Sequence, residues 1–168
     1  MKRGRMDERG VSLVELIIVM AIMAVIVGMT GFGLGMISNK PVDECAKKIE
    51  MLLNRNRTTV MGKKDAWLEF YLNDGRVTVQ EIIIEANGTT KRIGDSVTIG
   101  ADNVGMRLTY AGNTLELDTT HRKIGFRRDS GSLESKEGDF IYTKIEIYKG
   151  SYSKIITINE LTGKVTVE

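Results

Sequence analysis

The stretch RGVSLVELIIVMAIMAVIVGMTGFGLGMI, residues 9–37, decides the fold of this chain, because it separates a polar start from everything that follows. Between Leu16 and Ile37, Thr30 is the only residue whose side chain can form a hydrogen bond. A run of 22 residues of this kind is long enough to cross a bilayer as a helix. We therefore expect a membrane helix near the N-terminus and a water-exposed remainder.

The residues before this stretch predict its orientation. Residues 1–10 are polar and contain four basic side chains, Lys2, Arg3, Arg5 and Arg9. Basic residues on a short flank keep that flank in the cytoplasm, so the rest of the chain should lie outside. A secretory signal peptide has a shorter apolar core of about 7–15 residues. A plain signal anchor would fit the length.

Neither of these alternatives accounts for Glu15, which stands at the edge of the apolar run. An ionised carboxylate in lipid is costly unless it is paired or protonated, and such residues commonly mark function. The structural alternative is that Glu15 extends toward the lipid headgroups, since it lies close to one end of the span.

The segment from Arg9 to Val19, RGVSLVELIIV, resembles the processing site of type IV pilins and type II secretion pseudopilins. That pattern combines a short basic leader, a glycine, a hydrophobic residue, Ser or Thr, Leu, an aliphatic residue, Glu and a long apolar helix. The likeness covers roughly the first 40 residues and fills every slot of the pattern. Family members more often have Phe where this chain has Val11.

The resemblance implies a role for three residues. Gly10 would precede the bond cut by a prepilin peptidase, and Val11 would become the new, N-methylated terminus. Glu15 would pair with the free amine of Val11 on a neighbouring subunit during assembly. Burying two opposite charges together costs much less than burying one alone, so such a pair would set the register between helices.

Glycines crowd the end of the apolar run, at Gly28, Gly31, Gly33 and Gly35. Gly31 and Gly35 form a G-x-x-x-G pair, which favours close approach of helices in membranes. The alternative is a loosely helical exit from the bilayer. Many pilins have a proline here where this chain has Phe32, and the glycines would supply similar local weakness, since each costs about 1 kcal/mol of helix propensity.

An amphipathic helix is predicted over residues 39–64. Pro41 suits the first turn of a helix, and Asp43 and Glu44 follow at positions that favour the helix N-terminus. The apolar positions then recur with helical spacing, at Val42, Cys45, Ile49, Leu52, Leu53 and Val60. Cys45, the single cysteine, lies on this stripe, which predicts a buried thiol rather than a nucleophile.

From Ala66 onward the apolar period changes to two, which predicts β-strands. Trp67–Leu72 and Arg76–Ile84 should form a hairpin around Asn73-Asp74-Gly75. Strands follow at 96–99, 106–110 and 114–117, and the last third reads as a meander of strands at 123–126, 140–148, 153–159 and 165–167. The expected fold is α+β: a leader (1–10), a membrane and assembly helix (11–38), an amphipathic helix (39–64) and an extracytoplasmic antiparallel β domain (65–168).

The C-terminal third has a second, weaker likeness. A strand, a glycine loop and a closing hairpin around Gly163 are similar to the globular part of H-type minor pseudopilins and FimT-like minor pilins. This likeness favours a minor subunit.

Composition argues against several other classes of protein. Lys and Arg number 24 against 22 acidic residues, so no global charge drives binding to nucleic acid or anionic lipid. His121 is the only histidine, so we expect an exposed side chain beside Arg122 and no zinc site. Asp118, Asp129 and Asp139 match no calcium loop. No catalytic motif appears, and we predict no enzyme activity, no cofactor and no metal.

One local basic group could meet phosphates: Arg122, Lys123, Arg127 and Arg128, around a strand that contains Phe126. Such a group could serve a pilus-borne DNA-binding subunit, whereas the ordinary alternative is a solvated surface balanced by nearby acids. The first hypothesis is a structural, minor subunit of a type IV pilus or type II secretion pseudopilus. Its partners would be other pilin-like subunits, prepilin peptidase, an inner-membrane assembly platform and the lipid bilayer. A membrane-anchored enzyme or adhesin that only begins like a pilin is a third hypothesis.

Overall fold

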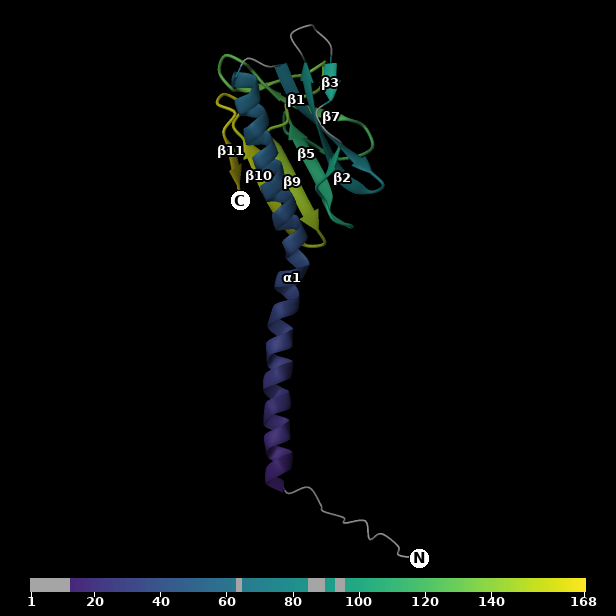
Figure 1. The fold of residues 1–168 in the computed structure, drawn as a ribbon, viewed down its shortest axis with the longest axis vertical. Helices are drawn as coiled ribbons and strands as arrows, with labels where there is room; N and C mark the ends of the chain where they lie inside the picture. Colours follow the sequence, from purple (N-terminus) through teal and green to yellow (C-terminus); the bar gives the residue numbers. More distant parts are fainter. Residues whose placement is uncertain (1–12, 63–64, 85–89, 93–95) are drawn as a thin grey trace, which may run out of the picture. The chain divides into compact units, whose positions relative to one another are not determined.

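The computed structural model of the chain describes residues 13–62, 65–84, 90–92 and 96–168, and for residues 28–38 and 90–92 it describes the backbone alone (Figure 1). The described elements are the helix α1 (Leu13–Met61) and the strands β1 to β11. The chain divides into two compact units, residues 1–38 and residues 39–168, so that α1 contributes to both.

In the first unit, α1 is apolar on every side over the residues whose side chains are described. Every side chain from Leu13 to Val27 is exposed, and Glu15 in the first turn is the single charged residue among them. An apolar surface of this extent needs cover. Within the part of the chain that the structure describes, no helix reaches the length and apolarity needed to span a bilayer.

Pro41 does not begin a helix, as the sequence suggested, but lies inside α1. Proline has no N–H to donate to the carbonyl four residues earlier, so this turn of the helix is weakened. The boundary between the two units falls close to it, between Ser38 and Asn39. The apolar and amphipathic stretches are therefore one helix with a proline within it.

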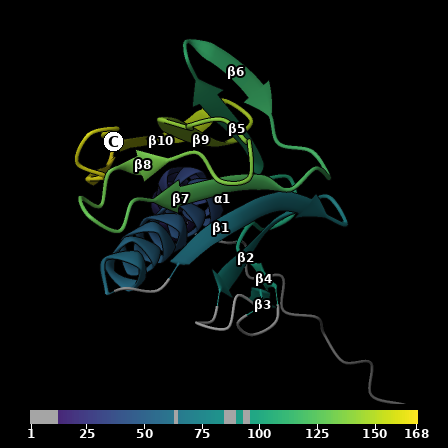
Figure 2. The same cartoon turned by 90° about the horizontal axis from the view of Figure 1, so that it is seen from above.

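The second half of α1 packs as its apolar spacing predicts. Val42, Cys45, Ile49 and Leu53 are each 0% exposed, and Val60 is 1% exposed. These residues belong to one core that also includes side chains of both sheets. Seen end-on in Figure 2, this part of α1 lies between β1 of one sheet and β9 and β10 of the other.

The first sheet has the strand order β3-β2-β1-β7-β8, with β4 pairing to β2 as well. Its strands are β1 (Asp65–Asn73), β2 (Arg76–Ile84), β3 (Thr90–Arg92), β4 (Val97–Thr98), β7 (Arg122–Phe126) and β8 (Leu133–Glu134). All described pairings are antiparallel, and the predicted β1–β2 hairpin is confirmed, with Asn73 opposite Arg76. The short strands β3 and β8 were not predicted.

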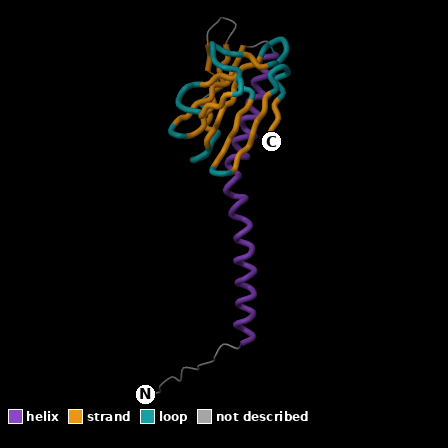
Figure 3. Tube along the Cα trace, turned by 180° about the vertical axis from the view of Figure 1, so that it is seen from behind, coloured by secondary structure: helices purple, strands orange, loops and turns teal. Residues whose placement is uncertain are grey.

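The second sheet has the order β11-β10-β9-β5-β6. Its strands are β5 (Gly105–Tyr110), β6 (Asn113–Glu116), β9 (Lys144–Lys149), β10 (Tyr152–Ile158) and β11 (Val165–Val167). The predicted C-terminal meander is wrong in one respect: β7 pairs with β1 in the first sheet, while β9 pairs with β5. Figure 3 shows the strands gathered along the C-terminal half of the helix.

The segment predicted as one strand over residues 140–148 forms a strand only from Lys144 onward. Asp139 explains the late start, because its carboxylate accepts hydrogen bonds from the Phe140 amide and the Tyr142 hydroxyl. The ring of Phe140 stacks on Tyr110 with centroids 4.1 Å apart. These local contacts replace ladder pairing for residues 140–142.

Candidate functional site

The processing residues Gly10 and Val11 lie outside the described residues. Helix α1 begins two residues after Val11, at Leu13, so Glu15 falls in its first turn. A carboxylate is favourable there, because the helix N-terminus carries partial positive charge. The helix thus places one acid at the N-terminal end of a wholly apolar surface.

The four glycines fall within α1, where the backbone is helical at Gly28, Gly31, Gly33 and Gly35. Residues four apart share one face of a helix, so Gly31 and Gly35 lie on the same face of α1. A role of this face in close helix packing stays a prediction.

The basic group predicted from the sequence is divided by the fold. Arg122 and Lys123 are successive residues of β7, so their side chains point to opposite faces of the first sheet. Arg122 lies 3.5 Å from Asp118, and Lys123 pairs with Glu137. These two cations therefore do not share a surface with each other.

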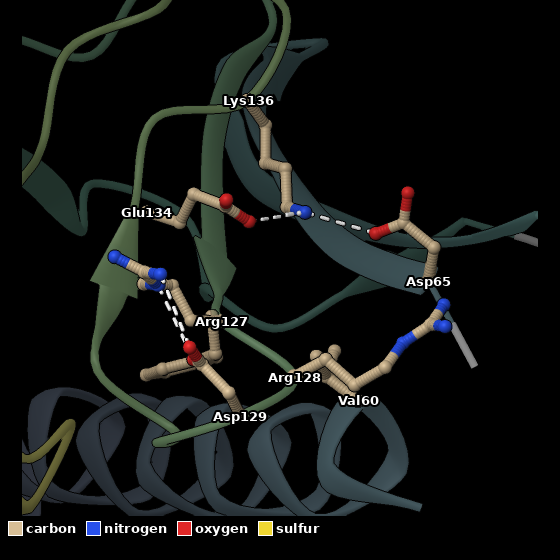
Figure 4. Close-up of a pocket in the computed structure, with 8 residues that line it drawn as sticks. Val60, Asp65, Arg127, Arg128, Asp129, Glu134 and Lys136 are labelled. Atoms are coloured by element: carbon tan, nitrogen blue, oxygen red, sulfur yellow. Dashed lines mark hydrogen bonds and ion pairs between the residues drawn. The ribbon is translucent and has the colours of Figure 1, made fainter. Parts of the chain in front are cut away.

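Arg127 and Arg128 follow β7 and line a cavity of about 430 Å³. Arg127 makes a two-pronged contact with Asp129, at 3.2 and 3.1 Å. A hydrogen bond from Ser130 helps to hold the pKa of Asp129 below its usual range. In Figure 4 the guanidinium groups of Arg127 and Arg128 point away from each other.

Lys136 is the central cation of this cavity. Its Nζ lies 2.9 Å from Asp65 Oδ1 and 2.7 Å from Glu134 Oε2 (Figure 4). Burial lowers the pKa of Lys136, but the hydrogen bonds to Glu134 and Asp65 outweigh it and raise the pKa above its ordinary value. The cavity thus holds bases and acids in balance, which does not suit it to bind a phosphate backbone.

His121 is less solitary than its place in the sequence suggests. Its Nδ1 lies 2.8 Å from Oε2 of Glu69, and its ring stacks on Tyr71 with centroids 4.0 Å apart. Glu69 is 8% exposed and also accepts a hydrogen bond from Trp67 Nε1 at 3.1 Å. Alternation along β1 brings Trp67, Glu69 and Tyr71 to one face, which is the signal that could have predicted this cluster.

The electrostatics of Glu69 follow from these contacts. Burial raises the pKa of Glu69, but the hydrogen bonds from His121 and Trp67 outweigh it, so the pKa lies below its ordinary value of 4.5. Glu69 therefore stays an anion that ties β1 to the residue preceding β7. This arrangement stabilises the first sheet.

The three aspartates considered for calcium are engaged in separate loops. Asp118 accepts from the Thr120 amide, Asp129 contacts Arg127, and Asp139 accepts from the Lys123 amide. Among the described residues, no group of three His, Cys, Asp or Glu side chains could hold a metal ion. Burial raises the pKa of the Cys45 thiol to about 12, so this thiol is poorly suited to act as a nucleophile.

Comparison with known proteins connects these observations at the N-terminus. No curated protein and no solved structure matches the chain. The family described as the prokaryotic N-terminal methylation motif matches residues 5–31, which include Gly10, Val11 and Glu15. The matched motif, which covers the N-terminal segment alone, supports a relationship of this segment to type IV pilins and pseudopilins.

Proposed function

We propose that the chain is a structural subunit of a type IV pilus or a type II secretion pseudopilus, which assembles through its N-terminal helix. One observation carries the proposal: from Leu13 to Val27, α1 exposes apolar side chains on every side, with Glu15 as the single charge among them. Such a surface is stable only against lipid or against other apolar helices. The methylation motif over the same residues favours a helix that lies first in lipid and then against the helices of other subunits.

The processing steps follow from the motif. A prepilin peptidase would remove the leader, residues 1–10, by cutting after Gly10, and Val11 would then receive a methyl group on its amine. Residues 11–38 would anchor the chain in the inner membrane with the leader in the cytoplasm. Residues 39–64 and the β domain, 65–168, would lie outside, first at the membrane and then in a surface or periplasmic filament.

Glu15 would act when a subunit leaves the membrane. Cleavage creates a cationic amine at Val11, and a carboxylate on the adjoining helix can neutralise it in an apolar setting. Because both groups lie near the same end of the helix, the pair would fix the axial register of neighbouring subunits. An assembly platform in the inner membrane would supply the work of extraction.

The C-terminal hairpin of the chain favours a minor subunit of the filament over a major one. Counting the copies of the chain per filament in purified material would test this assignment. The DNA-binding alternative gains no support from the contacts of the basic group, because Arg122, Lys123 and Arg127 each pair with an acid.

The test is to co-express the full chain with a prepilin peptidase and the assembly machinery. Mass spectrometry should find a chain that begins at Val11 with a methylated amine. Glu15→Ala should be inserted and cut as the wild type is but should be depleted from filaments by at least about tenfold, a loss of roughly 1.4 kcal/mol. A mature protein that still begins at Met1, or filaments that take up Glu15→Ala normally, would contradict the proposal.

A further inference from the structure

Helix α1 becomes buried abruptly where it enters the outer unit, which consists of residues 39–168. The side chain of Lys40 is 72% exposed, whereas Val42 and Cys45 are each 0% exposed. Val42 and Cys45 belong to the core that α1 shares with both sheets. The sheets therefore support the helix laterally from Val42 onward.

Pro41 lies immediately before this point and interrupts the hydrogen bonding of the helix. Its nitrogen has no hydrogen to donate to the carbonyl of Ile37, and its ring crowds that carbonyl. Sharp bends in helices occur mainly at such prolines, or where glycine or an inserted group disturbs the backbone. The helix thus lacks a backbone hydrogen bond at the position where its packing begins.

One hydrogen bond fastens the first turn of the buried helix to the second sheet. The hydroxyl of Tyr152, the first residue of β10, donates to Oδ1 of Asp43 at 2.8 Å and joins residues 109 positions apart. The side chain of Tyr152 packs against the core. The bond to Asp43 raises the pKa of Tyr152 above its ordinary value, because the hydroxyl must keep its proton in order to donate it.

The other polar contacts of this part of α1 are weaker or more distant. Lys40 and Glu44 lie 3.9 Å apart, but their side chains are 72% and 57% exposed, and an ion pair so open to water contributes little. In the described part of the chain, the next polar contact of α1 with a sheet is the ion pair of Arg55 with Glu81, at 3.3 Å. Among the same residues, the bond to Tyr152 is therefore the one polar contact that fixes the entry of the helix.

We propose that α1 has a hinge at residues 39–41 and that the hydrogen bond between Tyr152 and Asp43 is the clamp that limits its opening. A hinge consists of a few residues that absorb a change in backbone dihedral angles. Here the proline provides the weak turn, and the clamp keeps a bend from spreading into the residues that seal the core. The use of the hinge in assembly rests on the proposed function, because a subunit that exchanges lipid for other helices gains from a helix that bends where it enters the outer unit.

Amide hydrogen exchange in the full, detergent-solubilised chain tests the hinge and the clamp. In the wild type, the amides of residues 42–45 should exchange at least about a hundredfold faster than those of residues 52–54, because they open locally. Tyr152→Phe keeps the ring and removes the donor, so it should speed exchange at residues 42–45 by about a further tenfold. Pro41→Ala restores the missing N–H and should slow exchange there by at least about tenfold.

Two further variants separate the clamp from a general loss of stability. Tyr142→Phe removes a matching hydroxyl, which donates to another aspartate at 2.7 Å, and should leave exchange at residues 42–45 unchanged. Asp43→Asn keeps an acceptor oxygen and should retain most of the protection that Asp43→Ala loses. Equal exchange in both segments of the wild type, no local effect of Tyr152→Phe or Pro41→Ala, or the same effect from Tyr142→Phe would each overturn the inference. These measurements need no filaments, so the proposed function is tested separately.

Discussion

Gly163 shows how a single residue can secure the fold. Its φ of +62° is one that side chains rarely adopt, and a Cβ would overlap the Gly131 carbonyl. Gly163→Ala should therefore lower the free energy of unfolding by more than about 3 kcal/mol. Gly138 also has a positive φ but faces open space, so Gly138→Ala should cost only about 1–2 kcal/mol. Urea unfolding of both variants measures the difference, and equal losses would contradict this explanation.

Glu69 gives the fold a dependence on pH whose sign is fixed by its contacts. Its pKa is lower in the folded chain than the ordinary 4.5, so its contribution to stability is present above that value. The contribution is lost as pH falls through the folded pKa. Glu69→Gln should cost about 1.5–3 kcal/mol near neutral pH and little in acid. Urea unfolding at about pH 7 and about pH 3 checks this, with Glu160→Gln, a change at an exposed turn, as the control.

Among the elements, helix α1 divides sharply into core and surface positions beyond Pro41. Leu53 is 0% exposed and Met51 is 61% exposed, two positions apart on the helix. Leu53→Ala should lower the free energy of unfolding by about 2–5 kcal/mol, whereas Met51→Ala should change it by no more than about 0.5 kcal/mol. Thermal unfolding of the two variants side by side is the measurement. Comparable losses of stability in the two variants would mean that this half of α1 does not pack against the sheets through Leu53.

Sequence predicts elements best where the chain alone determines them. The Asp74-Gly75 and Ala111-Gly112 turns take positive φ at both positions, as two-residue hairpins require, and the strands on both sides of each turn were predicted. The spacing of Cys45, Ile49 and Leu53 likewise predicted the buried stripe. β7 could not be assigned to the first sheet, because its pairing with β1 depends on residues about 55 positions apart and not on local pattern. Alternation along β1 could have placed Glu69 beside Trp67 and Tyr71, but the contact with His121, 52 positions away, was missed for the same reason as the β7 pairing.

At the scale of the whole outer unit, α1 and both sheets together bury the thiol of Cys45. Cys45 is 0% exposed, and burial raises its pKa to about 12. A thiol-reactive disulfide should therefore modify the folded chain only as fast as the unit opens, and should modify it at once in denaturant. Leu53→Ala should speed the reaction, while Glu15→Ala should leave it unchanged. Rapid labelling of the native wild type would contradict a closed core.

The contact between Arg57 and the carbonyl of Gly131, at 3.1 Å, links residues 74 positions apart, and Gly163 completes it from near the chain's end. Arg57 is therefore synthesised long before Gly163, and the junction between the helix and the two loops cannot close until residue 163 has been made. A chain interrupted before that residue lacks one side of the junction, so a protease should cut it there while leaving the closed outer unit intact.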